Sequence, residues 1–258
     1  MADFTFVNEN GIPAKGNDAI FPIMKVVEGK WHPIGTGFFI ATNGIFLTAW
    51  HVLQDALDEN GRMNCDGIAA FHMLPDSIYI IRPILRSCHH VRSDLAVGAM
   101  AKATHNTTGK LLANKVMKLT LKPQEIGNEI VTWAYPKTVA GFENSKQTIR
   151  FSPDFYSGAI EEHFPDQRDN YLLPFPCYRG NIRIMGGASG GPVVNLDDGR
   201  VFGINCTGIK NTGGENVSHY TSLSVIGELW IDDVSIDGEQ HDHILMSELI
   251  TRGIIDCD

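Results

Sequence analysis

The residues best suited to chemistry in this chain are a serine, a histidine and an aspartate in three separate motifs. Ser189 lies in GGASGGPVV (186–194), where four glycines surround it. His51 ends the apolar run LTAWH, and Asp94 immediately precedes the apolar run LAVGAM. A serine hydroxyl becomes a nucleophile when a nearby base takes its proton, and that base needs a third group to orient it. The residue types therefore suggest acyl transfer by a Ser–His–Asp triad.

Each of the three residues also has a purely structural interpretation when it is taken alone. Ser189 fits a tight turn between strands, His51 fits a core histidine at a strand end, and Asp94 fits a turn or helix cap. Other acidic residues compete for the third role, although none precedes an apolar strand of the LAV type; they are Asp55, Asp66 and Asp76.

The segment GASGG also matches the G-x-S-x-G nucleophile elbow of α/β-hydrolases. In that fold a helix follows the serine, and Pro192 followed by two valines argues against a helix here. His219 or His243 lies downstream as that arrangement requires, but the necessary alternation of strands and helices is missing. We expect a different fold.

The elements that must position these residues are mostly short strands. Apolar runs rich in Val, Ile, Phe, Tyr and Thr are bounded by turn residues, and Asn43-Gly44 and Asp198-Gly199 are hairpin signals. This spacing predicts an all-β sandwich or barrel. The expected strands are 21–27, 36–42, 44–50, 77–85, 95–100, 129–135, 148–152, 191–196 and 200–208.

Helical patterns are few. Apolar residues recur at helical spacing in 51–61, 222–234 and 243–253. The last stretch ends in Arg252-Gly253, which fits a helix C-cap. The chain is therefore expected to hold many strands followed by a helical tail.

Composition limits the classes of partner. The 258 residues include 43 % hydrophobic and 20 % charged residues, as in ordinary soluble globular proteins. The formal net charge of −9, without a cluster of Lys and Arg, argues against nucleic acid or an anionic membrane as a partner. No stretch approaches the 18 or more apolar residues of a membrane span.

The cysteines indicate the compartment. Their number, five, is odd, and their scattered positions form no C-x-x-C pair, so neither a disulfide framework nor a zinc site is expected. The first residues also lack a basic region followed by an apolar run, as a signal peptide would have. Reduced thiols in a cytoplasmic protein are the expectation.

The remaining histidines do not suggest a metal. His89 and His90 are adjacent, and adjacent residues of a strand face opposite ways. His219, His241 and His243 are expected to be solvated. We therefore expect no metal and no cofactor.

The three motifs together resemble those of the trypsin-like and HtrA-like serine peptidases. TAWHV resembles the TAAHC or TNxHV motif, SDLAV resembles DIAL or DLAV, and GGASGGPVV resembles GDSGGP or GNSGGP. They follow one another in the family order of His, Asp and Ser. The resemblance covers roughly residues 20–230, and it is closest to stand-alone trypsin-like domains of the bacterial intracellular kind.

The resemblance implies a chymotrypsin-like, all-β fold of two packed antiparallel barrels, each of six strands, with the active site between them. Residues 15–112 would form the first barrel, which carries the histidine and the aspartate. Residues 113–236 would form the second barrel, which carries the serine. Residues 237–258 would form a short C-terminal helical tail.

The resemblance also implies the roles of the residues. His51 would take the proton of Ser189, and Asp94 would orient His51. The backbone N–H groups of Gly187 and Ser189 would form the oxyanion hole. Gly190 and the glycine after it would allow close approach of the substrate. The implied activity is that of a serine endopeptidase acting on protein or peptide substrates through an acyl-enzyme.

The substrate-binding residues are carried over from the same resemblance. VFGINCTG resembles the strand that pairs with the substrate backbone, which puts Cys206, Thr207 and Gly208 along the cleft. NIRIMGG would line the primary pocket, with Arg183 or Ile184 near its base. Arginine would favour an acidic substrate side chain and isoleucine an apolar one, and both alternatives remain open. Cys206 is interpreted as a small packed residue.

Two departures from the family bear on regulation. Ala188 stands where trypsin-type enzymes carry the aspartate that pairs with a newly cut N-terminus, so activation by that cleavage is not expected. Val52 replaces a half-cystine of the secreted members. The enzyme is then either active or latent until a regulatory protein partner binds, with the tail from residue 237 as a candidate for docking or autoinhibition. The alternative is a protease-fold binding module without turnover.

Overall fold

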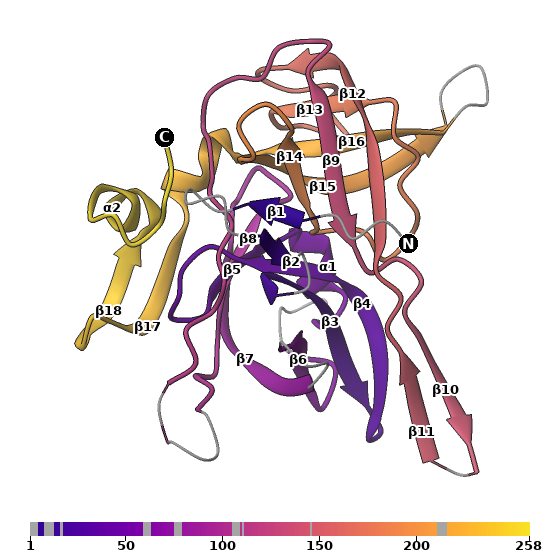
Figure 1. Ribbon diagram of the computed structural model, residues 1–258, viewed down its shortest axis with the longest axis vertical. Helices are drawn as coiled ribbons and strands as arrows, with labels where there is room; N and C mark the ends of the chain where they lie inside the picture. Colours follow the sequence, from indigo (N-terminus) through magenta and orange to yellow (C-terminus); the bar gives the residue numbers. More distant parts are fainter. Residues whose placement is uncertain are drawn as a thin grey trace.

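Two closed barrels, each of six antiparallel strands, make up the body of the protein (Figure 1). The computed structural model describes residues 5–7, 13–15, 18–58, 63–74, 79–104, 109, 111–144, 146–210 and 216–258. The expected all-β fold of two barrels with a short helix near the C-terminus is confirmed. Among the described residues, no helix is both long and apolar enough to cross a membrane.

The first barrel carries His51 and Asp94 at the ends of two neighbouring strands. His51 belongs to the short helix α1 (Trp50–Gln54), which directly follows β5 (Ile45–Thr48). Asp94 lies just before β8 (Ala96–Met100), which pairs with β5. The other strands are β3 (Ile20–Val27), β4 (Lys30–Phe39), β6 (Gly67–Met73) and β7 (Tyr79–His89), and the order around the barrel is β3-β4-β5-β8-β7-β6.

The second barrel carries Ser189 on the turn before β14 (Pro192–Asn195). Its interior is filled by large aromatic side chains, among them Tyr178, Phe202 and Tyr220. The other strands are β9 (Glu129–Ala134), β12 (Asp154–Phe164), β13 (Cys177–Gly180), β15 (Val201–Lys210) and β16 (Asn216–Ser222). The order around the barrel is β12-β13-β16-β15-β14-β9.

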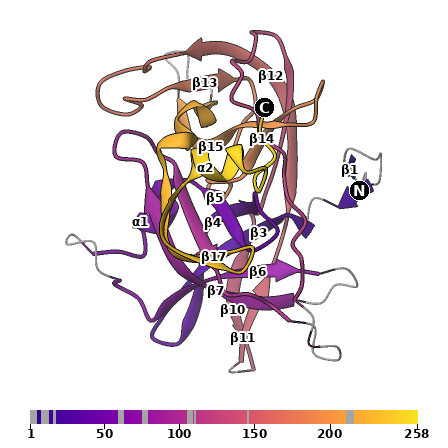
Figure 2. The ribbon, with the colours of Figure 1, turned by 90° about the vertical axis from the view of Figure 1, so that its left-hand side faces the viewer.

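Three two-stranded hairpins lie outside the barrels. Strand β1 (Thr5–Val7) pairs with β2 (Pro13–Lys15), and β10 (Val139–Glu143) pairs with β11 (Lys146–Arg150). The third hairpin follows a 3-10 helix, η3 (Leu223–Glu228), and joins β17 (Trp230–Ile236) to β18 (Glu239–Leu245) before helix α2 (Met246–Thr251). Figure 2 shows this hairpin in front of the first barrel, where β17 packs on β7 and β8.

Each strand expected from the sequence overlaps an observed strand, but the expected helices are only partly present. In 51–61 the helix ends at Gln54, and residues 59–61 lie outside the described part. The helix expected in 222–234 is wrong beyond Glu228, because β17 begins at Trp230. The reason is the turn Asp237-Gly238, where both residues have positive φ (51° and 87°), as a tight hairpin turn requires.

The segment 237–258 is a built-in part of the fold. Its first half is β18, and only Met246–Thr251 is α-helical. The helix is capped by Arg252 and followed by Gly253 at φ 71°, at the C-cap that the sequence predicts. Met246, Leu249 and Ile255 are almost fully buried in the main core. No residue of this segment lines the cleft described below. Autoinhibition by a tail that covers the cleft is therefore not supported.

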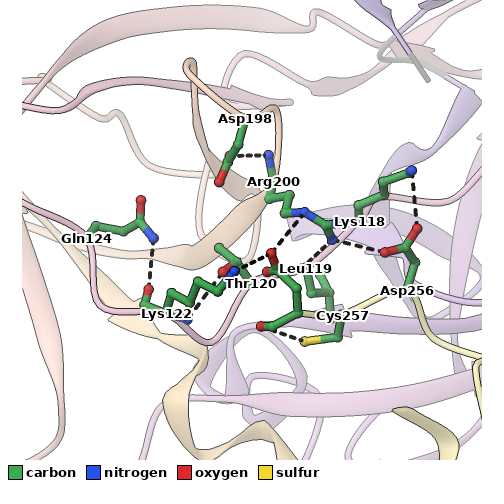
Figure 3. Close-up of polar contacts among 10 residues, drawn as sticks. Lys118, Leu119, Thr120, Lys122, Gln124, Asp198, Arg200, Asp256 and Cys257 are labelled. Carbon is green, nitrogen blue, oxygen red and sulfur yellow. Dashed lines mark hydrogen bonds and ion pairs between the residues drawn. The ribbon is translucent and has the colours of Figure 1, made fainter. Parts of the chain in front are cut away.

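The last residues pair with the connection between the two barrels (Figure 3). The backbone N–H of Leu119 donates to Asp256 O (2.8 Å), and that of Leu121 donates to Asp258 O (3.1 Å). Arg200 adds a guanidinium that donates to Leu119 O and to Asp256 Oδ1, both at 2.9 Å. The Lys122 ammonium pairs with Asp258 Oδ2 at 2.8 Å, but it is largely exposed.

We expect Arg200→Met to lower the free energy of unfolding by about 1–3 kcal/mol, because it removes two hydrogen bonds from a side chain that is mostly buried. Lys122→Met is the matched control, and its exposed ion pair is expected to contribute at most about 1 kcal/mol. Urea unfolding at neutral pH measures both. Equal losses in the two variants would contradict this account of the C-terminal contacts.

Candidate functional site

A cleft of about 520 Å³ brings the three motifs together. The first barrel contributes His51 and Asp94 to its lining, and the second barrel contributes Ser189. The complete lining is His51, Asp94, Leu172, Phe175, Ile184, Met185, Gly186, Ser189, Cys206, Thr207 and Gly208.

Asp94 holds both the ring and the backbone of His51. The Nδ1 atom of His51 lies 2.7 Å from Asp94 Oδ2, and the backbone N–H of His51 donates to Asp94 Oδ1 (2.9 Å). An ionised carboxylate can only accept hydrogen bonds, so the proton of a neutral ring lies on Nδ1. The Nε2 atom is then left as an acceptor, which is what a general base requires.

Cys206 gives Asp94 an additional hydrogen-bond donor. Its Sγ lies 3.2 Å from Asp94 Oδ2. Burial raises the pKa of the Cys206 thiol well above its usual range, and the negative charge of Asp94 adds to the effect. The sulfur is therefore a protonated donor and not a thiolate nucleophile. Cys206 also packs against Leu173 and Phe175, so the packing expected from the sequence is present.

The hydroxyl of Ser189 is directed at the backbone of the same cysteine. Ser189 Oγ donates to Cys206 O at 3.2 Å. Among the described residues, no hydrogen bond joins Ser189 to His51. The serine and histidine thus share one cleft, but the hydroxyl proton is held by a carbonyl oxygen in this conformation.

The turn that carries Ser189 is held by hydrogen bonds from both barrels. From the second barrel, the Asn205 side chain donates to Ala188 O (3.2 Å), and Gly190 N–H donates to Asn205 O (2.8 Å). From the first barrel, the fully buried Thr36 donates its N–H to Ser189 O (2.9 Å) and its hydroxyl to Gly187 O (3.1 Å). No sequence motif marks Thr36, because its role arises only from contact between the barrels.

Gly187 has the conformation and the space that only glycine fits. Its φ is 89°, and a Cβ atom there would lie 3.1 Å from Pro136 Cα. The N–H groups of Gly187 and Ser189 donate to no acceptor within the part of the chain that the structure describes. Ser189 lines the cleft, whereas Gly187 is not among the lining residues.

The role expected for Gly190 is wrong. A Cβ atom on Gly190 would lie 2.2 Å from both Thr36 O and Thr48 Oγ1, so this glycine lets the two barrels approach each other. At Gly191 a Cβ atom would meet Trp133 O at 2.9 Å. Both glycines therefore face protein and do not make room for a substrate.

The walls of the cleft are largely apolar. Ile184, Thr207 and Gly208 line it as expected from the sequence, whereas Arg183 is exposed and is not part of the lining. Met185 also lines the cleft, and it belongs to the segment NIRIMGG that the sequence places at the pocket. The apolar residues that sequence reasoning missed are Leu172 and Phe175. Leu172 and Phe175 come from the loop between β12 and β13, which has no recognisable motif.

The competing residues have other partners. Asp55 pairs with Lys25 at 2.8 Å, Asp66 accepts from Gly29 N–H at 3.0 Å, and Asp76 lies outside the described residues.

The adjacent histidines are also engaged. The ring of His89 stacks on Trp50, with ring centroids 3.8 Å apart, and His90 Nε2 lies 3.1 Å from Glu228 Oε2. The described residues contain no group of three or more His, Cys, Asp or Glu side chains suited to a metal ion.

His219 is buried, contrary to the expectation that it is solvated. It is 0 % exposed, and both ring nitrogens lack a hydrogen-bond partner among the described residues. Burial, together with the positive charges of Arg168 and Arg179, lowers its pKa to about 4. The ring is therefore neutral at neutral pH and carries two unpaired polar atoms on β16.

The low pKa of His219 predicts acid sensitivity. An unfolded chain, with a histidine pKa near 6.5, binds this proton at a higher pH than the folded protein does. The free energy of unfolding should fall as the pH drops from about 6.5 to 4, with about 3 kcal/mol of the loss due to His219. His219→Leu should remove that part of the pH dependence in urea unfolding.

His243→Gln is the control for this measurement, because His243 is largely exposed. His72, which is also buried with a pKa lowered to about 4 by burial and by Arg82, should keep its own share in both variants. A His219→Leu protein with the same acid dependence as the wild type would disprove the assignment.

Comparisons with known proteins identify the family and the fold. The sequence profile described as a trypsin-like peptidase domain matches residues 35–204. At the level of sequence alone, no curated protein matches the chain significantly.

Several solved structures share the fold. The apo protease domain of MamO from Magnetospirillum magneticum has a TM-score of 0.57 and 16 % identity, over 81 % of this chain and 94 % of that chain. Deg5 has a TM-score of 0.53 and 16 % identity, over 79 % of this chain and 84 % of that chain. The HtrA-type protease AlgW, with a decapeptide, has a TM-score of 0.53 and 16 % identity, over 81 % and 62 %.

Proposed function

Because the chain belongs to the family of trypsin-like peptidase domains, we propose that it is a serine endopeptidase that hydrolyses peptide bonds through Ser189, His51 and Asp94. The observation that carries this proposal is the 2.7 Å contact between His51 Nδ1 and Asp94 Oδ2 in a cleft that Ser189 also lines. That contact orients an imidazole base in the cleft that holds the Ser189 hydroxyl.

The reaction would begin with a rotation of the Ser189 side chain from Cys206 O towards His51 Nε2. Oγ then attacks the peptide carbonyl carbon, and its proton passes to Nε2. The N–H groups of Gly187 and Ser189 stabilise the negative oxygen, and each such donor contributes roughly 3–4 kcal/mol to lowering the barrier. The imidazolium returns the proton to the leaving amine, and water releases the acyl group by the same steps.

The hydrogen bond from Ser189 Oγ to Cys206 O supports a latent resting state. Breaking it costs about 1 kcal/mol, so the two serine orientations are close in free energy. A substrate or a regulatory protein bound in the cleft can shift this balance. The second candidate function is a protease-fold binding module without turnover, and the observation that favours it is that no hydrogen bond joins Ser189 to His51 among the described residues.

The proposed setting is the cytoplasm, with protein or peptide substrates. All five cysteines are free thiols, as expected in a reducing compartment. The net charge of −9 argues against nucleic acid or an anionic membrane as a partner.

Labelling with a fluorophosphonate tests the activity. We expect the wild type to be labelled at Ser189 and Ser189→Ala to be unlabelled. Asp94→Asn should react about 10³- to 10⁴-fold more slowly, because the imidazole ring of His51 loses the carboxylate that orients it. Ser247→Ala, at an exposed serine outside the cleft, is the matched control and should label normally. Intact-mass measurement detects the adduct.

The pattern of labelling separates the two candidates. An active enzyme is labelled alone, whereas a latent one is labelled only after a peptide substrate or partner is added. Absence of labelling under every condition, with the His51–Asp94 pair intact, would leave only the binding module.

The apolar walls of the cleft predict a preference for an apolar residue before the cleaved bond. Met185→Glu should introduce a preference for basic residues of about tenfold, because it places a carboxylate in the lining. Arg183→Glu is the control, since it changes charge at a neighbouring exposed position outside the lining. A peptide-library cleavage profile measures all three proteins. An unchanged profile for Met185→Glu would contradict this view of the pocket.

A further inference from the structure

A second cavity, of about 280 Å³, lies at the other end of β5 from His51. Its walls come from the turn between β4 and β5, from β7, from the connection after β8, and from the turn of the β17–β18 hairpin. It shares no residue with the cleft that holds Ser189. The cavity is thus bounded by the first barrel on one side and the C-terminal hairpin on the other.

The unusual feature of this cavity is Arg82, a lining residue that is only 3 % exposed. Its Nε atom donates to Ala101 O (2.9 Å), and Nη1 donates to the side-chain oxygen of Asn114. The guanidinium carbon of Arg82 lies over the ring of Phe39, 5.1 Å from the ring centroid. Nη1 also lies 3.5 Å from Nδ1 of His72. Within the described residues, no carboxylate pairs with Arg82 and no hydrogen bond is made by Nη2.

A buried cation without a counter-ion is costly, and proteins rarely keep one without a purpose. Burial lowers the pKa of Arg82 only to about 10, so the group remains positively charged at neutral pH. The neighbouring His72, with its pKa near 4, is neutral there and neither adds nor removes charge. Among the described residues, the positive charge of Arg82 therefore has no carboxylate at hydrogen-bond distance.

The rest of the lining defines the complementary ligand. Lys102 is exposed and forms no ion pair with an acid among the described residues, and Asp237 is the one acidic residue in the lining. Two positive charges and one negative charge leave an excess of one positive charge. Leu111, which is 62 % exposed, and Leu112 provide an apolar wall beside these groups.

We propose that this cavity binds a small organic anion that has one carboxylate and a short apolar body. A guanidinium presents paired N–H donors that match a carboxylate, and the leucines can cover the apolar part. The single excess charge fits a monoanion better than a phosphate, which carries nearly two negative charges at neutral pH. The cavity is slightly below the usual size of ligand pockets, which limits the ligand to a few carbon atoms.

Such a ligand would join the first barrel to the C-terminal hairpin, so its binding should raise the thermal unfolding temperature as well as release heat. We therefore propose calorimetric titration and thermal unfolding with 4-methylpentanoate as the probe. The uncharged 4-methylpentan-1-ol and inorganic phosphate are the comparison ligands. Neither readout requires peptidase activity, so a failure here and a failure of the proposed peptidase function are distinguishable.

Charge variants at the rim give opposite expected changes. Lys102→Gln should weaken binding of 4-methylpentanoate about fivefold, and Asp237→Asn should strengthen it about fivefold, because each changes the excess charge by one. Asparagine tolerates the positive φ of residue 237, so the hairpin turn is kept. Lys115→Gln makes the same charge change as Lys102→Gln outside the cavity and should have no effect.

Arg82→Met should abolish binding of 4-methylpentanoate if the variant folds. If it does not fold, Lys102→Gln and Asp237→Asn test the proposal in its place. The proposal is overturned if the wild type shows no saturable binding of 4-methylpentanoate, or if the alcohol binds equally well. It is also overturned if neither Lys102→Gln nor Asp237→Asn changes the affinity for 4-methylpentanoate. Tighter binding of inorganic phosphate would overturn the assignment to a monocarboxylate.

Discussion

The hydrogen bonds of Thr36 across the barrel interface are the constraint on which the rest of the cleft depends. His51 and Asp94 belong to one barrel and Ser189 to the other, so their relative position is only as definite as the contact between barrels. Thr36 donates to Ser189 O and to Gly187 O, and its own carbonyl accepts from Thr48 Oγ1 at 2.7 Å on the strand that leads to His51. Because Thr36 is fully buried, an unmade hydrogen bond there would cost about 1–3 kcal/mol.

A second junction lies on β15, where Cys206 connects the acid to the serine. Its thiol donates to Asp94, and its carbonyl accepts from Ser189 Oγ. The preceding residue, Asn205, is also fully buried and holds the turn before Ser189. Residues 205–206 of β15 therefore donate to the Asp94 carboxylate, accept the Ser189 hydroxyl in its resting position and hold the turn that carries Ser189. The balance between resting and reactive orientations of the serine depends on this strand.

The C-terminal hairpin packs on the outside of the first barrel, and its turn also forms one wall of the cavity that contains Arg82. Ile231, Ile236, Met246 and Leu249 extend the main hydrophobic core, so β17, β18 and α2 are held by burial of apolar surface. The hairpin turn meets the first barrel close to Arg82. The two cavities thus lie at opposite ends of β5, one between the barrels and one between a barrel and the hairpin.

The sequence by itself determined the residue types at Ser189, His51 and Asp94, the positions of many strands and the tight turns, because nucleophile chemistry, β-branched runs and Asn-Gly or Asp-Gly pairs are local patterns. The same local reasoning predicted a helix where β17 lies, because the spacing of its apolar residues fits the period of a helix as well as that of a strand. The tight turn at Asp237-Gly238 is the feature that favours a hairpin. Only the tertiary structure decided that Thr36 and Gly190 serve the interface, that Leu172 and Phe175 wall the cleft, and that His219 and Arg82 are buried. These roles depend on contacts between residues far apart along the chain, which leave no periodic or motif signal in the sequence.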